Sequence, residues 1–508
     1  MNATVGQGTR DETLARAERY SPFLRTMLAA FPEVGRTFER DGPDAAVAAA
    51  LSIDAPSTAE RLRRRRSALA LAVALADLAR EKPLEWVTAV LSDFADDAMD
   101  EALRTAMLER VPDEQPRGLS ILALGKLGSR ELNYSSDVDL VLLFDPATMP
   151  KRPRDDAGEA AARYGRRFVE LMQQRTADGY VARVDLRLRP APEVTPIVLP
   201  VGAAISYYES SALPWERAAF IRARAAAGDL DLGRLFLDEI RPFIWRRALD
   251  FGAIEEIRDI SMRIRDHYAQ GQAFGPGFDL KRGRGGIREA EFFTQVQQLI
   301  HGGREPQLRA PATLDALAAL SSGGWLDAGV ATSIAEAYRA LRTAEHRVQM
   351  IDDRQEHRLP ADGQALDRVA MLDGRERGAD LLELLAPHVE AVGAQFDGLV
   401  SEREERLSND PDILRAELEA IGFVEIDEAL RRVADWRSGR SRSLRSPAAR
   451  SAFESMLPTL MRSIAAGPIA RRAAAHGPGS GPGGRRAAAA RRAGDRGSPR
   501  STICRRCR

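Results

Sequence analysis

Two aspartates at the head of an apolar segment are the residues of this chain best suited to chemistry. Asp137 and Asp139 flank Val138 and lead into an apolar run that ends at Phe144. Side chains on a β-strand alternate between its faces, so a strand here would project both carboxylates to one side. Neighbouring carboxylates raise each other's pKa unless a cation lies between them, and Mg²⁺ takes oxygen ligands of this kind. The pair therefore predicts a metal site, although the same pattern also occurs in solvated turns and edge strands.

A corner of small residues, Gly128-Ser129, lies between an apolar run at residues 119–124 and the aspartate pair. Glycine lets the backbone approach a ligand closely, and free N–H groups with a serine hydroxyl can hold phosphate oxygens. We therefore expect Gly128 and Ser129 to bind phosphate beside the metal.

A third carboxylate is available in residues 180–188, where alternation predicts another strand. The charged face of this segment carries Arg183, Asp185, Arg187 and Arg189. An acid among arginines is typical of the salt-bridged outer face of an antiparallel sheet. Taken alone, that is the better interpretation of Asp185; that it completes a set of three metal ligands beside the aspartate pair is what the superfamily resemblance given next implies. Arg187 and Arg189 are then expected to bind the phosphates of a nucleotide by forked hydrogen bonds.

The residues of these segments and their order along the chain resemble the nucleotidyltransferase superfamily, in which a Gly-Ser corner precedes Asp-x-Asp on a strand. More closely, the chain resembles the glutamine synthetase adenylyltransferase/adenylyl-removing enzymes over roughly residues 58–460. The blocks that carry this resemblance are GKLGSRELNYSSDVDL (125–140), RVDLRLRP (183–190), YYESSALPWERAAFIRARAAAGD (207–229), FDLKRGRGGIREAEFFTQVQQLIHGG (278–303) and EHRVQMIDDRQEHRLP (345–360).

The resemblance implies an α+β fold with a small mixed sheet of the nucleotidyltransferase type, flanked by mostly α-helical domains. It also implies that Asp137, Asp139 and Asp185 hold two Mg²⁺ ions, and that the substrates are ATP, ADP or an AMP group, with phosphate. The implied partners are glutamine synthetase and a PII-type signalling protein. Enzymes of this family are usually about twice as long and carry two related halves. This chain resembles the first half, the one associated with removing AMP.

The composition narrows the class of protein further. The 508 residues include 74 Lys and Arg and 74 Asp and Glu, so the net charge is zero, which disfavours nucleic-acid binding. The only cysteines, Cys504 and Cys507, leave no disulfide framework, as in cytosolic proteins. No signal peptide is predicted at the N-terminus, and the apolar run at residues 68–78 is shorter than the roughly 20 residues that a bilayer requires. We expect a cytoplasmic protein that binds no membrane.

We expect a division into four segments. They are an N-terminal helical region (1–108), a nucleotidyltransferase catalytic domain (109–247), a helical domain (248–464) and a disordered tail rich in Ala, Arg and Gly (465–508). The predicted elements of the catalytic domain are strands at 119–124, 138–144 and 180–188 and a helix at 156–175, capped by Asp155 or Asp156. The predicted long helices of the helical domain are 254–267, 287–299, 328–353 and 379–403. In the N-terminal region we expect separate helices at 84–90 and 95–108.

The tail has two further interpretations. Its arginines are suited to nucleic acid or an acidic surface, and the abrupt loss of the family pattern near Gly467 is also what a truncation or a change of reading frame would produce. Cys504 and Cys507 form C-x-x-C without a second ligand pair, so neither zinc nor redox chemistry is predicted.

Other motifs outside the aspartate constellation each have two interpretations. The segment from Lys281 to Gly286 looks like a phosphate loop but lacks the G-x-x-x-x-G-K-[ST] pattern, so we expect a glycine-rich helix start that packs against the catalytic domain. The resemblance allows Arg222 or Arg224, expected on a helix that begins at Trp215, to contact phosphate.

Two histidines near acids pose the same choice. The spacing of His346 and His357, with Glu345 and Asp352 nearby, matches no metal-ligand pattern, so we expect a polar network on a helix.

Three functions remain open. The first is Mg²⁺-dependent removal of AMP from the adenylylated tyrosine of glutamine synthetase by phosphate, which releases ADP. Such a reaction relies on positioning and electrostatics, and we expect it to need no histidine. The second is the reverse, the transfer of AMP from ATP to that tyrosine. The third is a non-catalytic fragment that binds glutamine synthetase or a PII-type protein. The resemblance to the removing half favours the first.

Overall fold

The computed structural model describes residues 8–213, 215–246, 273–401, 407–408, 410–423, 425–437 and 447–465. The chain forms two compact units, Met1–Glu405 and Arg406–Arg508. The domain boundaries expected after residues 108 and 247 fall inside the first unit. The predicted helix at 254–267 and the tail beyond residue 465, with Cys504 and Cys507, lie outside the described residues.

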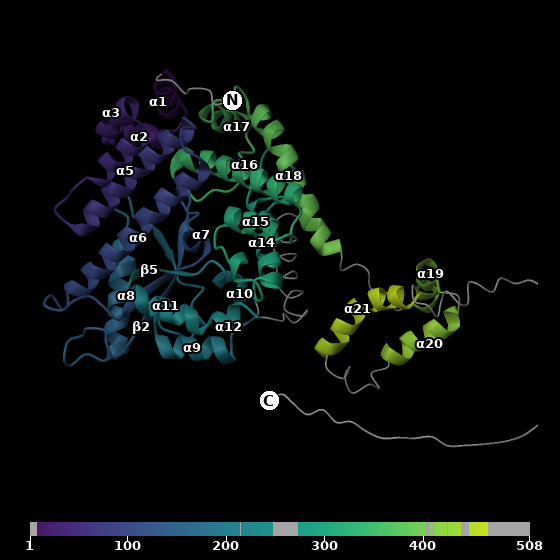
Figure 1. Cartoon of the computed structure of the whole chain (residues 1–508). Coiled ribbons are helices and arrows are strands. Elements are labelled where there is room, and N and C mark those ends of the chain that lie inside the picture. Colours follow the sequence, from purple (N-terminus) through teal and green to yellow (C-terminus); the bar gives the residue numbers. More distant parts are fainter. Residues whose placement is uncertain are drawn as a thin grey trace, which may run out of the picture. The chain divides into compact units, whose positions relative to one another are not determined.

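A mixed sheet forms the centre of the first unit (Figure 1). Its strands are β1 (Leu119–Ala123), β2 (Asp137–Phe144), β3 (Arg183–Asp185), β4 (Val198–Pro200) and β5 (Arg224–Gly228). They are ordered β3-β2-β1-β5, and β4 pairs with the second half of β2. β1 runs antiparallel to β2 and β5, whereas β3 and β4 run parallel to β2. The predicted α+β fold with a small mixed sheet is confirmed, and β3 does not belong to an antiparallel pair.

Helices surround this sheet in the described part of the first unit. They are α1 (Gly8–Tyr20), α2 (Pro22–Ala30), α3 (Pro32–Asp41), α4 (Pro43–Leu51), α5 (Thr58–Leu78), α6 (Leu84–Leu108), α7 (Gly125–Gly128), α8 (Ala157–Gln173), α9 (Val201–Ser210), α10 (Glu216–Phe220), α11 (Leu230–Glu239), α12 (Arg241–Ile244), α14 (Ile287–His301), the 3-10 helix η1 (Pro306–Leu308), α15 (Thr313–Ser322), α16 (Ala328–Asp352), α17 (Gly363–Leu372) and α18 (Gly378–Ser401).

Both faces of the sheet are buried, because apolar residues alternate between two cores. Ile121 and Leu140 pack in the core shared with helices α1 to α6 and α8. Val141 and Leu143 pack on the opposite face with α9 to α12 and α14. Asp137 and Asp139 share the parity of Val141, so they stand on the second face, at the end of β2 that the helices leave open to a cavity.

Several predicted elements differ in extent. The strand expected at 180–188 is limited to β3, and the helix expected to run through Arg222 and Arg224 ends at Phe220, so that Arg224 begins β5. The alanine-rich segment forms β5 because it pairs with the edge of β1 that β2 leaves open. The helices expected at 84–90 and 95–108 are one continuous helix, α6.

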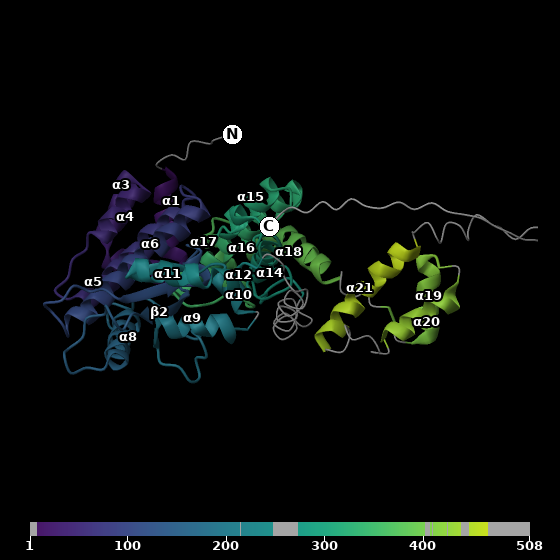
Figure 2. The same cartoon turned by 60° about the horizontal axis from the view of Figure 1, so that its bottom comes forward.

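Other predictions are confirmed. Asp156 caps α8 by accepting a hydrogen bond from the Glu159 backbone N–H at 3.0 Å. Helices α14, α16 and α18 match the long helices expected at 287–299, 328–353 and 379–403 to within two residues at each end. These three, with α15 and α17, enclose a core of their own. They are the teal and green helices of the first unit in Figure 2.

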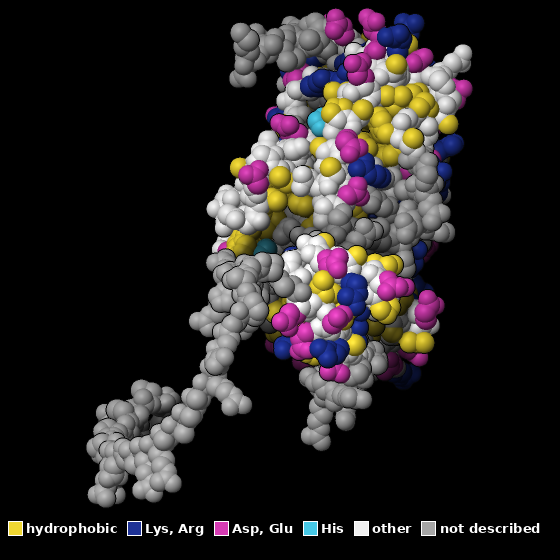
Figure 3. Space-filling model, turned by 90° about the vertical axis from the view of Figure 1, so that its right-hand side faces the viewer, with side chains coloured by type: hydrophobic (Ala, Val, Ile, Leu, Met, Phe, Trp, Pro, Cys, Tyr) yellow, Lys and Arg dark blue, Asp and Glu magenta, His cyan; other side chains and the backbone are white. Residues whose placement is uncertain are grey.

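The second unit contains the described helices α19 (Pro411–Ile421), α20 (Ile426–Arg437) and α21 (Pro447–Ala465). Leu418, Val433 and Leu457 lie in its small apolar core. On the face drawn in Figure 3, acidic and basic side chains are interspersed, in keeping with 74 residues of each sign. None of the helices described is both long and apolar enough to cross a membrane.

Candidate active site

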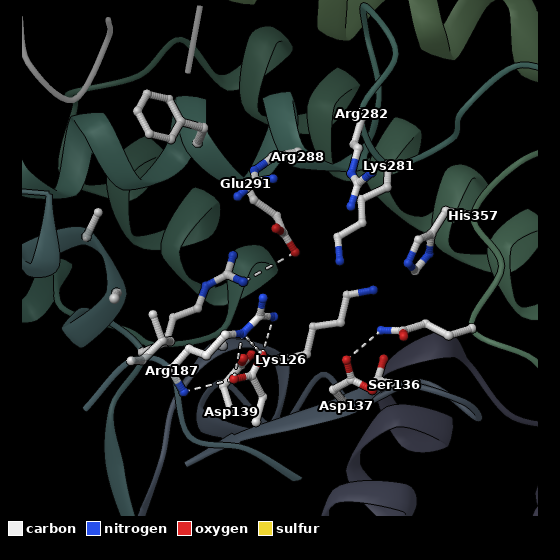
Figure 4. Close-up of a pocket in the computed structure, with 18 of the residues that line it drawn as sticks. Lys126, Ser136, Asp137, Asp139, Arg187, Lys281, Arg282, Arg288, Glu291 and His357 are labelled. Atoms are coloured by element: carbon white, nitrogen blue, oxygen red, sulfur yellow. Dashed lines mark hydrogen bonds and ion pairs between the residues drawn. The ribbon is translucent and has the colours of Figure 1, made fainter. Parts of the chain in front are cut away.

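A cavity of about 810 Å³ opens beside α14, where β2 begins and β3 ends (Figure 4). Asp137, Asp139 and Asp185 lie along its sheet side. Lys281, Arg282 and Arg288 lie across from them, on the loop that precedes α14 and on the first turn of that helix. The three aspartates thus face a group of cations across the cavity, although Glu291 also lies on the side of the cations and Lys126 on the side of the aspartates.

The three aspartates come together because β3 runs parallel to β2. In the register of the two strands, Asp139 is opposite Asp185, and Asp137 is opposite Arg183. Burial, reinforced by the charges of Asp185 and Asp137, raises the pKa of Asp139 to about 6. Burial and neighbouring carboxylates both favour the protonated form of an acid.

Arginines hold the other two carboxylates. Asp137 accepts a hydrogen bond from Arg183 Nε at 2.6 Å and one from Gln355 Nε2 at 3.0 Å. Asp185 accepts from the backbone N–H and the Nε of Arg187, at 2.8 Å and 2.9 Å. Hydrogen bonding to Arg187 keeps the pKa of Asp185 below its usual value.

In this structure the three aspartates are not arranged as a complete set of metal ligands. Within the described parts of the chain, no group of three or more His, Cys, Asp or Glu side chains is arranged to hold a metal ion. The donor chemistry nevertheless suits a hard cation, because Asp139 and Asp185 present oxygens side by side and repel each other.

The small-residue corner, expected to bind phosphate, is packed into the fold. A Cβ on Gly128 would clash with the Arg222 carbonyl, and Ser129 Oγ donates to the carbonyls of Gly125 and Lys126, both at 3.2 Å. Neither Gly128 nor Ser129 lines the cavity; Gly125 and Lys126 do. The short helix α7 turns the chain so that its start faces the cavity and its end faces the core.

Gly125 is required where it stands. Its φ of +56° is a left-handed conformation, and a Cβ there would clash with the carboxylate of Asp139. The absence of a side chain thus makes room for a candidate metal ligand.

The arginines expected to bind phosphate divide into two groups. Arg187 and Arg222 line the cavity. Arg189 does not, since its guanidinium donates to the carbonyls of Leu186 at 2.8 Å and Pro192 at 2.7 Å. Arg224 is likewise engaged elsewhere, in an ion pair with Asp96 at 2.7 Å.

The loop before α14 contributes cations that the sequence interpretation set aside. Asp279 Oδ1 accepts from the backbone N–H groups of Lys281 at 3.0 Å and Arg282 at 2.8 Å, which holds the loop in place. Gly286 precedes the first residue of α14, as expected for a helix start, while Gly285 packs against the Val389 carbonyl of α18. The K-R-G-R-G-G composition was the only hint of this cationic wall.

The histidine-rich segment supplies both a buried network and a cavity residue. His346 is fully buried, with Nδ1 3.0 Å from Asp77 Oδ2 and Nε2 3.1 Å from Asn133 Oδ1, which confirms the expected polar network. His357, in contrast, lines the cavity. The cavity thus contains a histidine, although the proposed chemistry was expected to need none. The position of His357 depends on long-range packing that the spacing of the residues does not reveal.

A buried ion pair joins this segment to the start of α7. Lys126 Nζ lies 2.9 Å from Glu345 Oε2, and His357 Nδ1 lies 2.7 Å from Glu345 Oε1. Although burial alone would raise the pKa of Glu345, Lys126, His357 and Arg342 hold it well below its usual value. Burial lowers the pKa of Lys126 to about 8.

Comparison with known proteins shows which family the chain that forms this cavity resembles. Residues 15–239 match the family model for glutamate-ammonia ligase adenylyltransferase. Curated relatives named bifunctional glutamine synthetase adenylyltransferase/adenylyl-removing enzyme include one from Rhizobium meliloti, 42% identical over 79% of this chain and 43% of the relative. Another, from Agrobacterium fabrum, is 39% identical over 90% of this chain and 50% of the relative.

The chain is similar to this adenylyltransferase family over most of its length. It spans about half the length of the curated relatives that it matches. Residues 258–400 also match the model of the GlnD PII-uridylyltransferase family, and this segment includes the cationic loop and His357. Both the acidic and the cationic wall of the cavity thus lie in regions that match nucleotidyltransferase families.

Proposed function

We propose that the cavity catalyses transfer of an AMP group to or from a tyrosine of glutamine synthetase. The observation that carries this proposal is the pairing of Asp139 with Asp185 on neighbouring strands, opposite the cations Lys281, Arg282 and Arg288. Paired acids suit a divalent ion, and facing cations suit phosphate groups. The printed names of the curated relatives supply the protein substrate.

For the direction of the reaction, we propose removal of AMP by phosphate, with ADP as product. The support is the resemblance of the sequence to the removing half of the family. The wall formed by Lys281, Arg282 and Arg288 can hold the entering phosphate, and Arg187 offsets charge that gathers on the adenylyl phosphorus. Arg222 lines the same cavity but is held by Glu291, at 3.3 Å, so its role is to shape this wall.

The proposed cofactor is Mg²⁺, held by Asp137, Asp139 and Asp185. When bound, a divalent ion of this kind supplies electrostatic stabilisation for the phosphoryl group. Arg183 and Gln355 orient Asp137 before any ion arrives, since both donate to its carboxylate. Gly125 leaves the space that Asp139 needs.

Phosphorolysis tests the proposal directly. The purified chain is incubated with adenylylated glutamine synthetase, Mg²⁺ and phosphate, and ADP is measured. We expect ADP from the wild-type chain, none from Asp137→Asn, and unchanged formation from Asp231→Asn, whose carboxylate is 92% exposed on α11. Wild-type activity that survives Asp137→Asn would falsify the assignment of the site.

The reverse reaction is the second candidate, because the printed names of the relatives include adenylyltransferase activity. Labelled ATP with unmodified glutamine synthetase distinguishes the two, since label on the protein supports transfer. Recognition of a PII-type protein by residues 258–400 is favoured by their match to the PII-uridylyltransferase model. A chain that binds these partners yet makes no product in either direction would support the non-catalytic interpretation.

A further inference from the structure

We propose that His357 transfers the proton at the tyrosyl oxygen of the adenylyl–tyrosine bond, with Glu345 as the residue that positions it. This inference rests on the proposed function, and it holds for either direction of the reaction. In removal of AMP, the imidazolium is the general acid. In the reverse reaction, the neutral ring is the general base.

The tautomer of the ring follows from its partner. Glu345 is fully buried, and its neighbours keep its pKa low, so it is a carboxylate that can only accept hydrogen bonds. His357 Nδ1, 2.7 Å from Glu345 Oε1, therefore carries a proton. The remaining nitrogen, Nε2, has no hydrogen-bond partner among the residues that the structure describes, and the residue lines the cavity (Figure 4).

The backbone of His357 is fixed beside the phosphate-binding wall. The Leu280 N–H donates to the His357 carbonyl at 2.8 Å, which joins its segment to the loop that carries Lys281. Two residues before His357, Gln355 donates to Asp137 at 3.0 Å. The ring is thus held between the acids and the cations, where a substrate bridging them would lie.

Other candidates for this proton are less suitable. His346 has both ring nitrogens engaged, by Asp77 and Asn133, and is fully buried. Lys126 is held in its ion pair with Glu345. Among the histidines that the structure describes, His357 alone lines this cavity.

The proton has a definite place in the reaction. An oxygen of hydrogen phosphate forms a bond to the adenylyl phosphorus while the bond from phosphorus to the tyrosyl oxygen breaks. The Nε2 proton passes to the tyrosyl oxygen, which otherwise leaves as a phenolate of pKa about 10. The phosphate releases its proton to water, and the ring regains one from water. The products are ADP and tyrosine, with atoms and charge in balance.

The dependence on the leaving group tests this role. Glutamine synthetase is prepared with tyrosine or with the more acidic 3,5-difluorotyrosine at the modified position, and both forms are adenylylated. His357→Gln is expected to lower the rate of ADP formation from the tyrosine form by about 10²–10⁴-fold, a typical general-acid contribution. Its effect on the difluorotyrosine form is expected to be less than about tenfold, because that phenolate leaves without a proton. Glu345→Gln should show the same bias to a smaller degree.

The controls separate this role from structural effects. His388→Gln, on α18 away from the cavity, should match the wild-type chain on both substrates. His357→Asn, with thermal unfolding measured for each variant, provides a second substitution should His357→Gln fold poorly. An equal loss on both substrates would overturn the proton-transfer role while leaving the proposed function intact. A wild-type chain that forms no ADP from either substrate would instead overturn the proposed function, and this role with it.

Discussion

Lys126 and Glu345 form an ion pair of 2.9 Å, although 219 residues separate them in the chain. Lys126 belongs to α7, beside the aspartates, and Glu345 belongs to α16. Asn133 Nδ2 also donates to Glu345, at 2.6 Å. The short helix beside the aspartates and α16 therefore share one buried charge network.

Breaking this pair should destabilise the protein strongly. Glu345→Ala leaves the Lys126 ammonium buried without its partner, which typically costs about 3–5 kcal/mol. Urea denaturation followed by circular dichroism measures the loss. The control is Arg36→Ala, which removes an exposed pair with Glu33 and should change stability by less than about 1 kcal/mol. Similar losses in both variants would show that the buried pair has no special role.

A methyl group at Gly125 should disable the site. Gly125→Ala forces a left-handed residue to carry a Cβ against the Asp139 carboxylate, so we expect a loss of about 1–2 kcal/mol from the backbone alone. Mg²⁺ affinity and ADP formation should fall with it. Gly202→Ala is the matched control, because a Cβ there meets no atom within 4 Å. An active Gly125→Ala variant would contradict the proposed place of Asp139.

Mg²⁺ affinity should rise with pH through about 6. Burial and the charge of Asp185 raise the pKa of Asp139 to about 6, so below that pH a proton occupies the carboxylate and competes with the ion. Calorimetric titration between about pH 5 and pH 7.5 should show affinity rising about tenfold per unit below 6 and levelling above it. In Asp139→Asn this dependence should vanish. A flat profile for the wild-type chain would argue against Asp139 as a ligand.

Arg187 and Arg189 should respond differently to the same substitution. Arg187 is 83% exposed at the cavity, so Arg187→Ala should weaken ADP binding about ten- to a hundredfold and leave thermal stability nearly unchanged. Arg189 donates to backbone carbonyls, so Arg189→Ala should lower stability by about 1–3 kcal/mol and barely affect ADP. Calorimetry measures the ADP affinity of both variants, and thermal melts measure their stability. A comparable loss of ADP affinity in Arg189→Ala would contradict this division.

Local patterns predicted the positions of both site strands, although β3 is shorter than the segment expected at 180–188. Alternation along β2 places Asp137 and Asp139 together and sends Val138 and Leu140 into the core, which requires only the two-residue period of a strand. Family resemblance, not periodicity, selected Asp185, whose pairing with β2 is a matter of topology. The parallel pairing of β3 with β2 could not be predicted from the residues of β3 alone.

Features set by tertiary packing were harder to predict. A Gly-Ser corner does not reveal which of its residues face a cavity, and here the short helix α7 turns Gly125 and Lys126 toward it. Likewise, His357 reaches the site through its contacts with Glu345 and Leu280, not through any ligand spacing. Glu345 lies only 12 residues before His357, but this spacing does not show that the contact with Leu280 brings the ring to the cavity.

The most direct test of the central claim is anomalous diffraction from crystals of the chain grown with Mn²⁺ and ADP. We predict a Mn²⁺ peak in contact with the carboxylates of Asp137, Asp139 and Asp185, with the ADP phosphates between that peak and the loop carrying Lys281. Peaks elsewhere, or ordered ADP with no metal at these aspartates, would contradict it.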